Sequence, residues 1–286
     1  MPTNTRVCGL MLAYFHAEMT LRCLKTLENQ GIETLILVDN SADLAEHQRT
    51  LALAQHFPPD WLQVVIAPEN LGFGRGMNLA WQRAQMLGQW DYALILNNDI
   101  VAQSVLVKTL CTHMGQNPRT ALLGVAAETG TGVQSGLHYQ RWTGLMFPIA
   151  VVGSFQVAAG YCLLLRPQAL QGTLFDSRYF MYGEDVELSW RLREQGWNVE
   201  ILAQPLLQHI PAQSSREGSL FYEYHINRGH WLLVNSLGEN LFECSLMYFL
   251  RIPTLLARSL LRSWRFHCLM PLKAFFSAFY NYFRYQ

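Results

Sequence analysis

The stretch TLILVDNSADLAEHQRTLALAQHFPPDWLQVVIAP, residues 34–68, contains the pattern that decides the fold. An apolar run at 34–41 is followed by a predicted helix near 43–56 and by a second apolar run at 61–68. The same alternation is expected on both sides, with apolar runs at 7–15 and 92–100 and helices at 18–29 and 77–87. Strands separated by helices of about ten residues imply βαβ units and a parallel sheet, so the chain is predicted to be an α/β protein.

Polar residues end these apolar runs, and their place in the sheet indicates a ligand site. Asp39 and Asn40 end the second run, and Asn97, Asn98 and Asp99 end the fourth. Ligands of such sheets sit beyond the carboxyl ends of the strands, so we expect these side chains to converge on one crevice.

A glycine-rich segment, NLGFGRGMN at 70–78, lies between a predicted strand and a predicted helix. Backbone amides at such a place can approach a phosphate. The segment is not the dinucleotide fingerprint, because Met77 stands where its third glycine belongs. A plain tight turn is the alternative explanation of these glycines.

A paired acid, Glu184-Asp185, lies in FDSRYFMYGEDVELSWRLREQGW at 175–197, ahead of a predicted helix. A carboxylate at a helix N-terminus is stabilised in its ionised form by the helix dipole and the free N–H groups. Such a carboxylate can act as a base if another group activates the electrophile. The alternative is that Asp185 only caps the helix that carries Trp190.

A metal site is predicted where the fourth apolar run ends. Mg²⁺ and Mn²⁺ favour oxygen ligands, usually one or two carboxylates together with substrate phosphates, and Asp99 supplies one carboxylate. His209 follows a later strand-like run and could supply an imidazole, although a single histidine is commonly a hydrogen-bonded surface residue.

Length and composition indicate a globular enzyme-sized protein. The 286 residues are half hydrophobic, enough for one large α/β domain or two small ones.

The six cysteines lie far apart, and this spacing predicts reduced core residues in a cytosolic protein. No secretory signal opens the chain. The uncharged segment 142–165 could span a bilayer by length, but polar residues and glycines interrupt it, and we expect two strands there.

The C-terminal region, residues 236–286, differs in kind from the rest. Residues 241–286 hold six Lys or Arg residues against Glu243 alone, a charge of +5 in a neutral chain. Past Pro271 the apolar residues share one helical face: Leu272, Phe275, Phe276, Phe279, Tyr280 and Phe283. An amphipathic, aromatic and basic helix suits a membrane interface, so we expect an anionic membrane surface as partner and no nucleic acid. The alternative is a helix packed on the core or in a homodimer.

Five segments in this order resemble the inverting family 2 glycosyltransferases of GT-A fold, in particular the rhamnosyltransferase-like branch that builds bacterial surface polysaccharides such as O-antigen. They are VDNS at 38–41, NLGFGRGMN at 70–78, LILNNDI at 94–100, AAGYCLLLRPQAL at 158–170 and FMYGEDVELSWRLREQGW at 180–197. The resemblance implies a glycosyltransferase domain at 1–235, with a mostly parallel central sheet flanked by helices. The C-terminal helical region would follow at 236–286.

The resemblance also implies a nucleotide-sugar donor in the N-terminal crevice. Asp39 would accept a hydrogen bond from a uracil or thymine ring. The other residues implied at the donor nucleotide are Asn40, Asn70, Gly72, Arg75, Asn78 and Asn98. dTDP-rhamnose is the favoured donor, and a UDP-sugar is second. The implied acceptor is a lipid-linked glycan, which would place the enzyme in the cytoplasm, peripherally on the inner face of the cell membrane.

For the reacting centre, the resemblance implies Asp185 as general base and Asp99 as ligand of Mg²⁺ or Mn²⁺, with His209 beside the metal. Asn97 departs from the family motif, which starts with Asp, so metal binding is expected to be weaker. The residues implied at the donor sugar and acceptor are Ala159, Gly160, Glu184 and Arg228. Glu187 stands where many relatives carry Asp, and we expect it to pair with Arg191 at i+4.

Two other functions fit part of the pattern. A nucleotidyltransferase also uses a glycine-rich turn and a metal-bound Asp, but it would need a basic residue on the transferred phosphate and has no use for a base at Asp185. A non-catalytic, membrane-associated protein of the same fold is the second alternative, and Asn97 gives it some weight.

Overall fold

The computed structural model describes residues 5–130, 132–210 and 217–284. Its first part alternates strands and helices as the sequence predicts: β1 (Val7–Ala13), α1 (Ala17–Leu27), β2 (Thr34–Asp39), α2 (Leu44–Ala54), β3 (Leu62–Ile66), α3 (Gly72–Leu87) and β4 (Tyr92–Asn97). β2 is buried along its whole length, because helices cover both faces of this part of the sheet. A strand covered on both faces needs a continuous apolar run, which explains the pattern in the sequence.

The second part of the chain has shorter elements. They are β5 (Ile100–Ala102), α4 (Leu106–Gln116), β6 (Thr120–Thr129), β7 (Gly132–Gln134), β8 (Leu137–Gln140), β9 (Met146–Phe147), β10 (Ser154–Val157), β11 (Cys162–Leu165), the 3-10 turn η1 (Pro167–Ala169), α5 (Glu184–Glu194) and β12 (Asn198–His209). The uncharged segment 142–165 is thus made of strands and turns and not of a helix, with three strands (β9, β10 and β11) where two were predicted.

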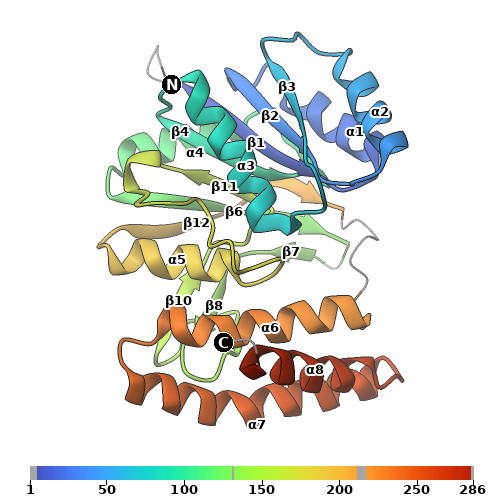
Figure 1. Ribbon diagram of the computed structural model, residues 1–286. Coiled ribbons are helices and arrows are strands. Elements are labelled where there is room, and N and C mark those ends of the chain that lie inside the picture. Colours follow the sequence, from blue (N-terminus) through green and yellow to red (C-terminus); the bar gives the residue numbers. More distant parts are fainter. Residues whose placement is uncertain (1–4, 131, 211–216, 285–286) are drawn as a thin grey trace.

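The central sheet has the order β3-β2-β1-β4-β11-β6-β12-β5, with β7 beside β6. The first four strands are parallel, which confirms the predicted βαβ half. β11 is antiparallel to β4 and β6, and β5 is antiparallel to β12, so the sheet is mixed beyond β4. Helices flank it on both sides in Figure 1.

Helix α3 begins at Gly72, five residues before the predicted start, so the glycine-rich segment is mostly helix and not a turn. The reason is close packing. A Cβ on Gly76 would lie 2.5 Å from the Leu12 side chain on β1, and one on Gly74 would lie 3.2 Å from the Tyr179 carbonyl oxygen. The glycines let the helix approach the sheet and the segment at 175–180.

Three helices close the chain: α6 (Leu220–Leu237), α7 (Leu241–Arg265) and α8 (Met270–Arg284). They form a layer below the central sheet in Figure 1, with α5, β8 and β10 between. One hydrophobic cluster joins this layer to α5: Tyr139, Phe155, Val186, Trp231, Met247, Leu255, Phe275 and Tyr282 are among its members. The cluster crosses the predicted boundary at 236, and that boundary stays a prediction.

The predicted aromatic stripe of α8 is divided between the interior and the surface. Phe275 is buried and Phe279 is partly buried against Trp231 of α6, whereas Phe276 and Tyr280 are more than half exposed. Four of the six cysteines are buried and two are partly buried, and all six are free thiols, as predicted.

Candidate active site

Asp39 ends β2 in a fully buried position. Its Oδ1 accepts hydrogen bonds from the backbone N–H of Ser41 at 3.0 Å and the Ser41 hydroxyl at 2.6 Å, and its Oδ2 lies 2.9 Å from Nδ1 of His47. Burial alone would raise the pKa of Asp39, but these hydrogen bonds outweigh it and hold the pKa below its usual value. Asp39 is therefore a carboxylate held in one orientation at the end of a central strand.

Asn40 fixes the start of α3. Its amide nitrogen donates to Oδ1 of Asn70 at 3.0 Å, and its Oδ1 accepts from the backbone N–H of Leu71 at 2.8 Å. Asn70 in turn accepts from the backbone N–H of Gly72 at 3.0 Å. Asn40 and Asn70, both predicted to bind the donor nucleotide, thus join the carboxyl end of β2 to the N-terminus of α3 and hold each other in place.

The N-terminal half of α3 is tied to the segment ahead of the acid pair. The backbone N–H of Phe73 donates to the Phe180 carbonyl at 2.7 Å. Asn78 exchanges two hydrogen bonds with the backbone of Phe175, at 2.8 and 2.9 Å. Asn78 thereby acts as a brace between α3 and the 175–180 segment, with its amide group already engaged.

Asp185 lies in the first turn of α5, where its Oδ1 accepts from the backbone N–H of Val186 at 2.8 Å. Its Oδ2 lies 3.3 Å from the backbone N–H of Gly160. Burial raises the pKa of Asp185, and these N–H groups only partly offset the rise. A carboxylate with a raised pKa is a stronger base than an exposed one. The Oδ1 contact is of the capping kind, and Oδ2 faces the turn between β10 and β11.

That turn links Asp185 to the predicted metal residues. A Cβ on Gly160 would lie 3.8 Å from Oδ2 of Asp185 and 3.9 Å from the Phe73 ring, so base, turn and α3 meet there. The next residue, Tyr161, accepts the backbone N–H of Asn97 at 3.0 Å and stacks on the His209 ring at 5.2 Å. Ala159 precedes Gly160 in the turn and is partly buried.

Asp99 and His209 meet at the edge of the sheet, with His209 Nε2 3.3 Å from Asp99 Oδ1. The backbone N–H of Ile210 also donates to the Asp99 carbonyl at 2.9 Å, which fixes the two segments to each other. Among the residues that the structure describes, no group of three or more His, Cys, Asp or Glu side chains is placed to hold a metal. One buried carboxylate and one imidazole fit a divalent ion that takes its other ligands from a diphosphate and water.

Glu184 precedes the base and is 6% exposed. Its Oε2 has no hydrogen-bond partner within the described part of the chain. Burial, with a smaller contribution from the neighbouring Asp185 charge, raises the pKa of Glu184 to about 8. Burial therefore favours the neutral carboxylic acid form of Glu184, which has an O–H group to donate. Glu187 instead pairs with Arg191 at 2.9 Å, as predicted.

Three predicted site residues point to other partners. Arg75 is 44% exposed at its side chain and pairs with Glu69 at 3.1 Å. Arg228 donates to the Arg178 carbonyl at 2.7 Å, and the Asn98 amide donates to the Thr20 hydroxyl at 2.9 Å. Their roles at the donor and acceptor stay predictions.

Sequence reasoning did not identify His47, Tyr161 or Ser189 near the site. Ser189 donates to the Asp185 carbonyl at 2.7 Å, one turn along α5, and accepts the backbone N–H of Ala158. Its i+4 spacing from Asp185 was a usable signal. No local signal marks His47, because its contact with Asp39 depends on how α2 packs beside β2.

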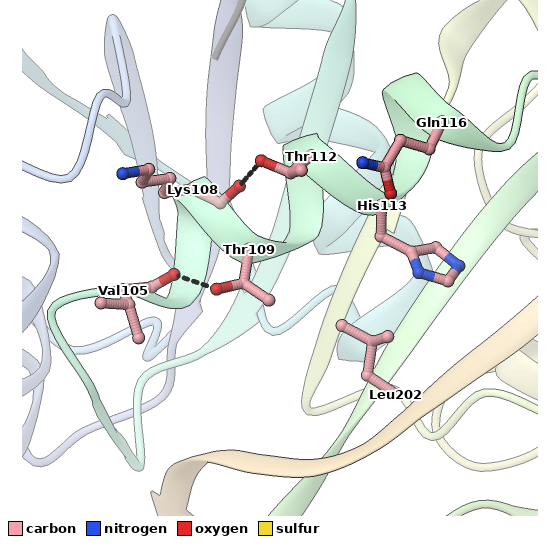
Figure 2. A pocket seen from close by; sticks show the side chains of 7 residues that line it. All are labelled: Val105, Lys108, Thr109, Thr112, His113, Gln116 and Leu202. Atoms are coloured by element: carbon pink, nitrogen blue, oxygen red, sulfur yellow. Dashed lines mark hydrogen bonds between the residues drawn. The ribbon is translucent and has the colours of Figure 1, made fainter.

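A surface hollow elsewhere does not belong to this site. It lies between α4 and β12, as Figure 2 shows, and is lined by Val105, Lys108, Thr109, Thr112, His113, Gln116 and Leu202. Two of its polar groups are already engaged within the helix, since Thr109 and Thr112 donate to carbonyls one turn earlier.

Two solved structures share this arrangement of strands and helices. The mannosyltransferase of Pyrobaculum calidifontis in complex with GDP-Man and Mn²⁺ has a TM-score of 0.58 at 12% identity, over 100% of this chain and 77% of its own. GalNAc-T7 with UDP, GalNAc and Mn²⁺ has a TM-score of 0.62 at 12% identity, over 82% of this chain and 48% of its own. This likeness shows the predicted GT-A fold.

One curated relative of the chain has a named activity. The N-acetylglucosaminyl-diphospho-decaprenol L-rhamnosyltransferase of Mycobacterium tuberculosis is 25% identical over 234 residues, which cover 71% of this chain and 74% of that protein. This similarity confirms the resemblance to rhamnosyltransferase-like family 2 enzymes that the motifs predicted. No protein-family model matches the chain.

Proposed function

We propose that this chain is an inverting glycosyltransferase that moves rhamnose, or a similar sugar, from a nucleotide diphosphate to a hydroxyl of a lipid-linked glycan. The observation that carries the proposal is the meeting of Asp185, Gly160 and Phe73, where the base helix reaches the start of α3. The name of the mycobacterial relative supports the sugar and the lipid-linked acceptor. dTDP-rhamnose is the favoured donor and UDP-sugars are second.

The donor nucleotide would lie at the ends of β2 and α3. Asp39, held by Ser41 and His47, presents a fixed negative group to a ring N–H. Asn40 and Asn70 set the first turn of α3, whose N-terminal dipole favours the diphosphate. Pre-ordered groups lose little entropy when the donor binds.

Transfer needs one proton acceptor and a charged leaving group. The acceptor hydroxyl attacks the anomeric carbon as the bond from that carbon to the diphosphate breaks. Asp185 takes the hydroxyl proton, and a single displacement inverts the anomeric centre without a covalent enzyme intermediate. Asp99 and His209 would hold a divalent metal, which supplies charge stabilisation to the diphosphate when bound. Two of the structural relatives were solved with Mn²⁺, which supports Mn²⁺ or Mg²⁺.

The protein would act in the cytoplasm, bound peripherally to the inner face of the cell membrane, where a lipid-linked acceptor is accessible. Within the described part of the chain, helix α7 is long and apolar enough to cross a membrane by length and composition. Most of its apolar stretch is not buried, so the helix presents apolar surface outward.

The decisive experiment compares Asp185→Asn with the unchanged chain. We expect nucleoside diphosphate release from the donor to fall roughly 10²–10⁴-fold in the variant, with donor affinity retained. Turnover near that of the unchanged chain would remove Asp185 as base. Pyrophosphate release by the unchanged chain would instead favour a nucleotidyltransferase, and binding without any turnover would favour a non-catalytic role.

A further inference from the structure

Helix α7 places three of its four cations toward the inside of the molecule and a row of apolar residues on the outside. We define its outer face as Phe242, Leu246, Phe249, Pro253, Leu260 and Trp264, which follow spacings of three, four and seven residues. These positions share one side of a helix. All six are exposed, and Phe242, Phe249 and Trp264 are 72–80% exposed. No charged residue interrupts this face.

Three of the four cations of α7 lie on the opposite side and have partners inside the protein. Arg258 and Arg262 pair with the fully buried Glu223 of α6, at 3.2 and 2.7 Å. Arg251 is fully buried and donates to the carbonyls of three residues: Arg141, Trp142 and His230. Half of the six cations of the C-terminal region thus have partners inside the protein, whereas Arg265, Lys273 and Arg284 are exposed.

The size of the outer face exceeds what a soluble monomer normally leaves uncovered. At roughly 150–250 Å² for a whole aromatic side chain, its three aromatic residues alone expose roughly 350–550 Å². The largest apolar patch on a typical monomer is about that size in total. Leu246, Pro253 and Leu260 add to it, so a partner of apolar chemistry is needed.

Helix α7 cannot cross the bilayer in this fold, although its length of 25 residues would allow it. Its inner side packs Met247 and Leu255, both fully buried, into the cluster shared with α5 and α6. A spanning orientation would break that core and expose Arg251 to lipid. The helix is therefore suited to lie flat, with one side in lipid and the other on the protein.

We propose that α7 lies in the plane of the bilayer, with its outer face inserted between headgroups and acyl chains, and that this insertion holds the enzyme on the membrane. This inference rests on the proposed function, because a lipid-linked acceptor requires a position at the membrane. Charge placement selects lipid as the occupant, since no charged residue of α7 lies on its outer face. Exposed Arg265 and Lys273 remain near its C-terminal end, where headgroups would lie.

Substitutions on the outer face of α7 test this membrane contact better than truncation of the C-terminal helix α8 does. Removing α8 would uncover Trp231, which Phe275 and Phe279 contact at 6.2 and 5.6 Å between ring centres. The test variant is Phe249→Glu with Leu260→Glu, both on the outer face of α7. Its matched control is Leu51→Glu with Met86→Glu, two exposed apolar residues on α2 and α3. Circular dichroism and the melting temperature check that all chains fold alike.

The assay is flotation of the full chain with vesicles of phosphatidylcholine alone, and with vesicles containing phosphatidylglycerol. We expect binding to both, little release by salt, and a loss of about a hundredfold or more in the α7 variant, since each large apolar side chain contributes about tenfold or more. The control variant should bind like the unchanged chain. Nucleoside diphosphate release without vesicles should be unaffected in both variants.

Three results would overturn the inference. They are unchanged flotation of the α7 variant, flotation only with anionic vesicles and release by salt, or a vesicle-independent dimer that the α7 substitutions convert to monomers. The donor assay separates this inference from the proposed function. A chain that binds vesicles through α7 but never turns over a nucleotide sugar would refute the glycosyltransferase proposal alone.

Discussion

Replacing Glu184 with Gln should stabilise the protein, and the gain should grow with pH. Glu184 is buried, and its pKa is about 8 in the folded chain against an ordinary value of 4.5. A raised pKa means that the stability associated with this group is fully present below pH 4.5 and is lost as pH rises through about 8. The Gln variant cannot ionise, so it escapes that loss.

The magnitude follows from the two pKa values. At about 1.4 kcal/mol for each pH unit, the unchanged chain should lose ~3–4 kcal/mol between pH 5 and pH 8 through Glu184. The free energy of unfolding of Glu184→Gln relative to the unchanged chain should therefore rise by that amount over this range. Urea unfolding followed by circular dichroism at pH 5, 6.5 and 8 measures it.

Glu187→Gln is the matched control in the same helix. Glu187 is 7% exposed but is paired with Arg191, so its replacement should cost about 1–2 kcal/mol and gain nothing at high pH. If the stabilities of the Glu184→Gln and unchanged chains stay parallel from pH 5 to pH 8, then Glu184 ionises freely in the folded chain and our account of it is wrong.

Three further results are expected. EDTA should abolish sugar transfer, and Asp99→Ala should weaken Mn²⁺-dependent donor affinity in a titration with the nucleotide sugar; full activity in EDTA would show that no metal is needed. Gly72→Ala should destabilise the chain by roughly 2 kcal/mol or more in urea unfolding, because Gly72 has φ +74° and its Cβ would lie 2.2 Å from the Phe180 carbonyl oxygen. Arg251→Met should cost roughly 3–5 kcal/mol in the same measurement, since it leaves buried carbonyls without a donor, and a loss below 1 kcal/mol would contradict this.

The parallel half of the fold could be predicted from sequence because each strand there is a continuous apolar run. The start of α3 could not. Glycine has a low helix propensity, so the segment at 70–78 indicated a turn. The helix forms there because Gly74 and Gly76 allow contacts with Tyr179 and Leu12, residues distant in sequence. Tertiary packing, and not local helix propensity, therefore determines where α3 begins.

The C-terminal region shows a second property that the sequence alone could not predict, namely which of its cations have partners inside the protein. Counting residues gave +5 and suggested a cationic surface. The partner that neutralises Arg258 and Arg262 is Glu223, which lies outside the counted segment and 35–39 residues away. Similarly, Asp185 and Asp99 could be chosen from motifs, whereas His47 and Tyr161 needed the packed structure.

The cluster that joins α5 to α7 holds Asp185 in a fixed position relative to α7, the helix proposed to lie on the membrane. Val186, next to Asp185, shares this cluster with Met247 and Leu255 on the inner side of α7. With the outer face of α7 on the bilayer, the catalytic carboxylate would stand at one set height, because no linker separates the two. The protein would then select acceptor hydroxyls by their height above the bilayer as well as by their chemistry.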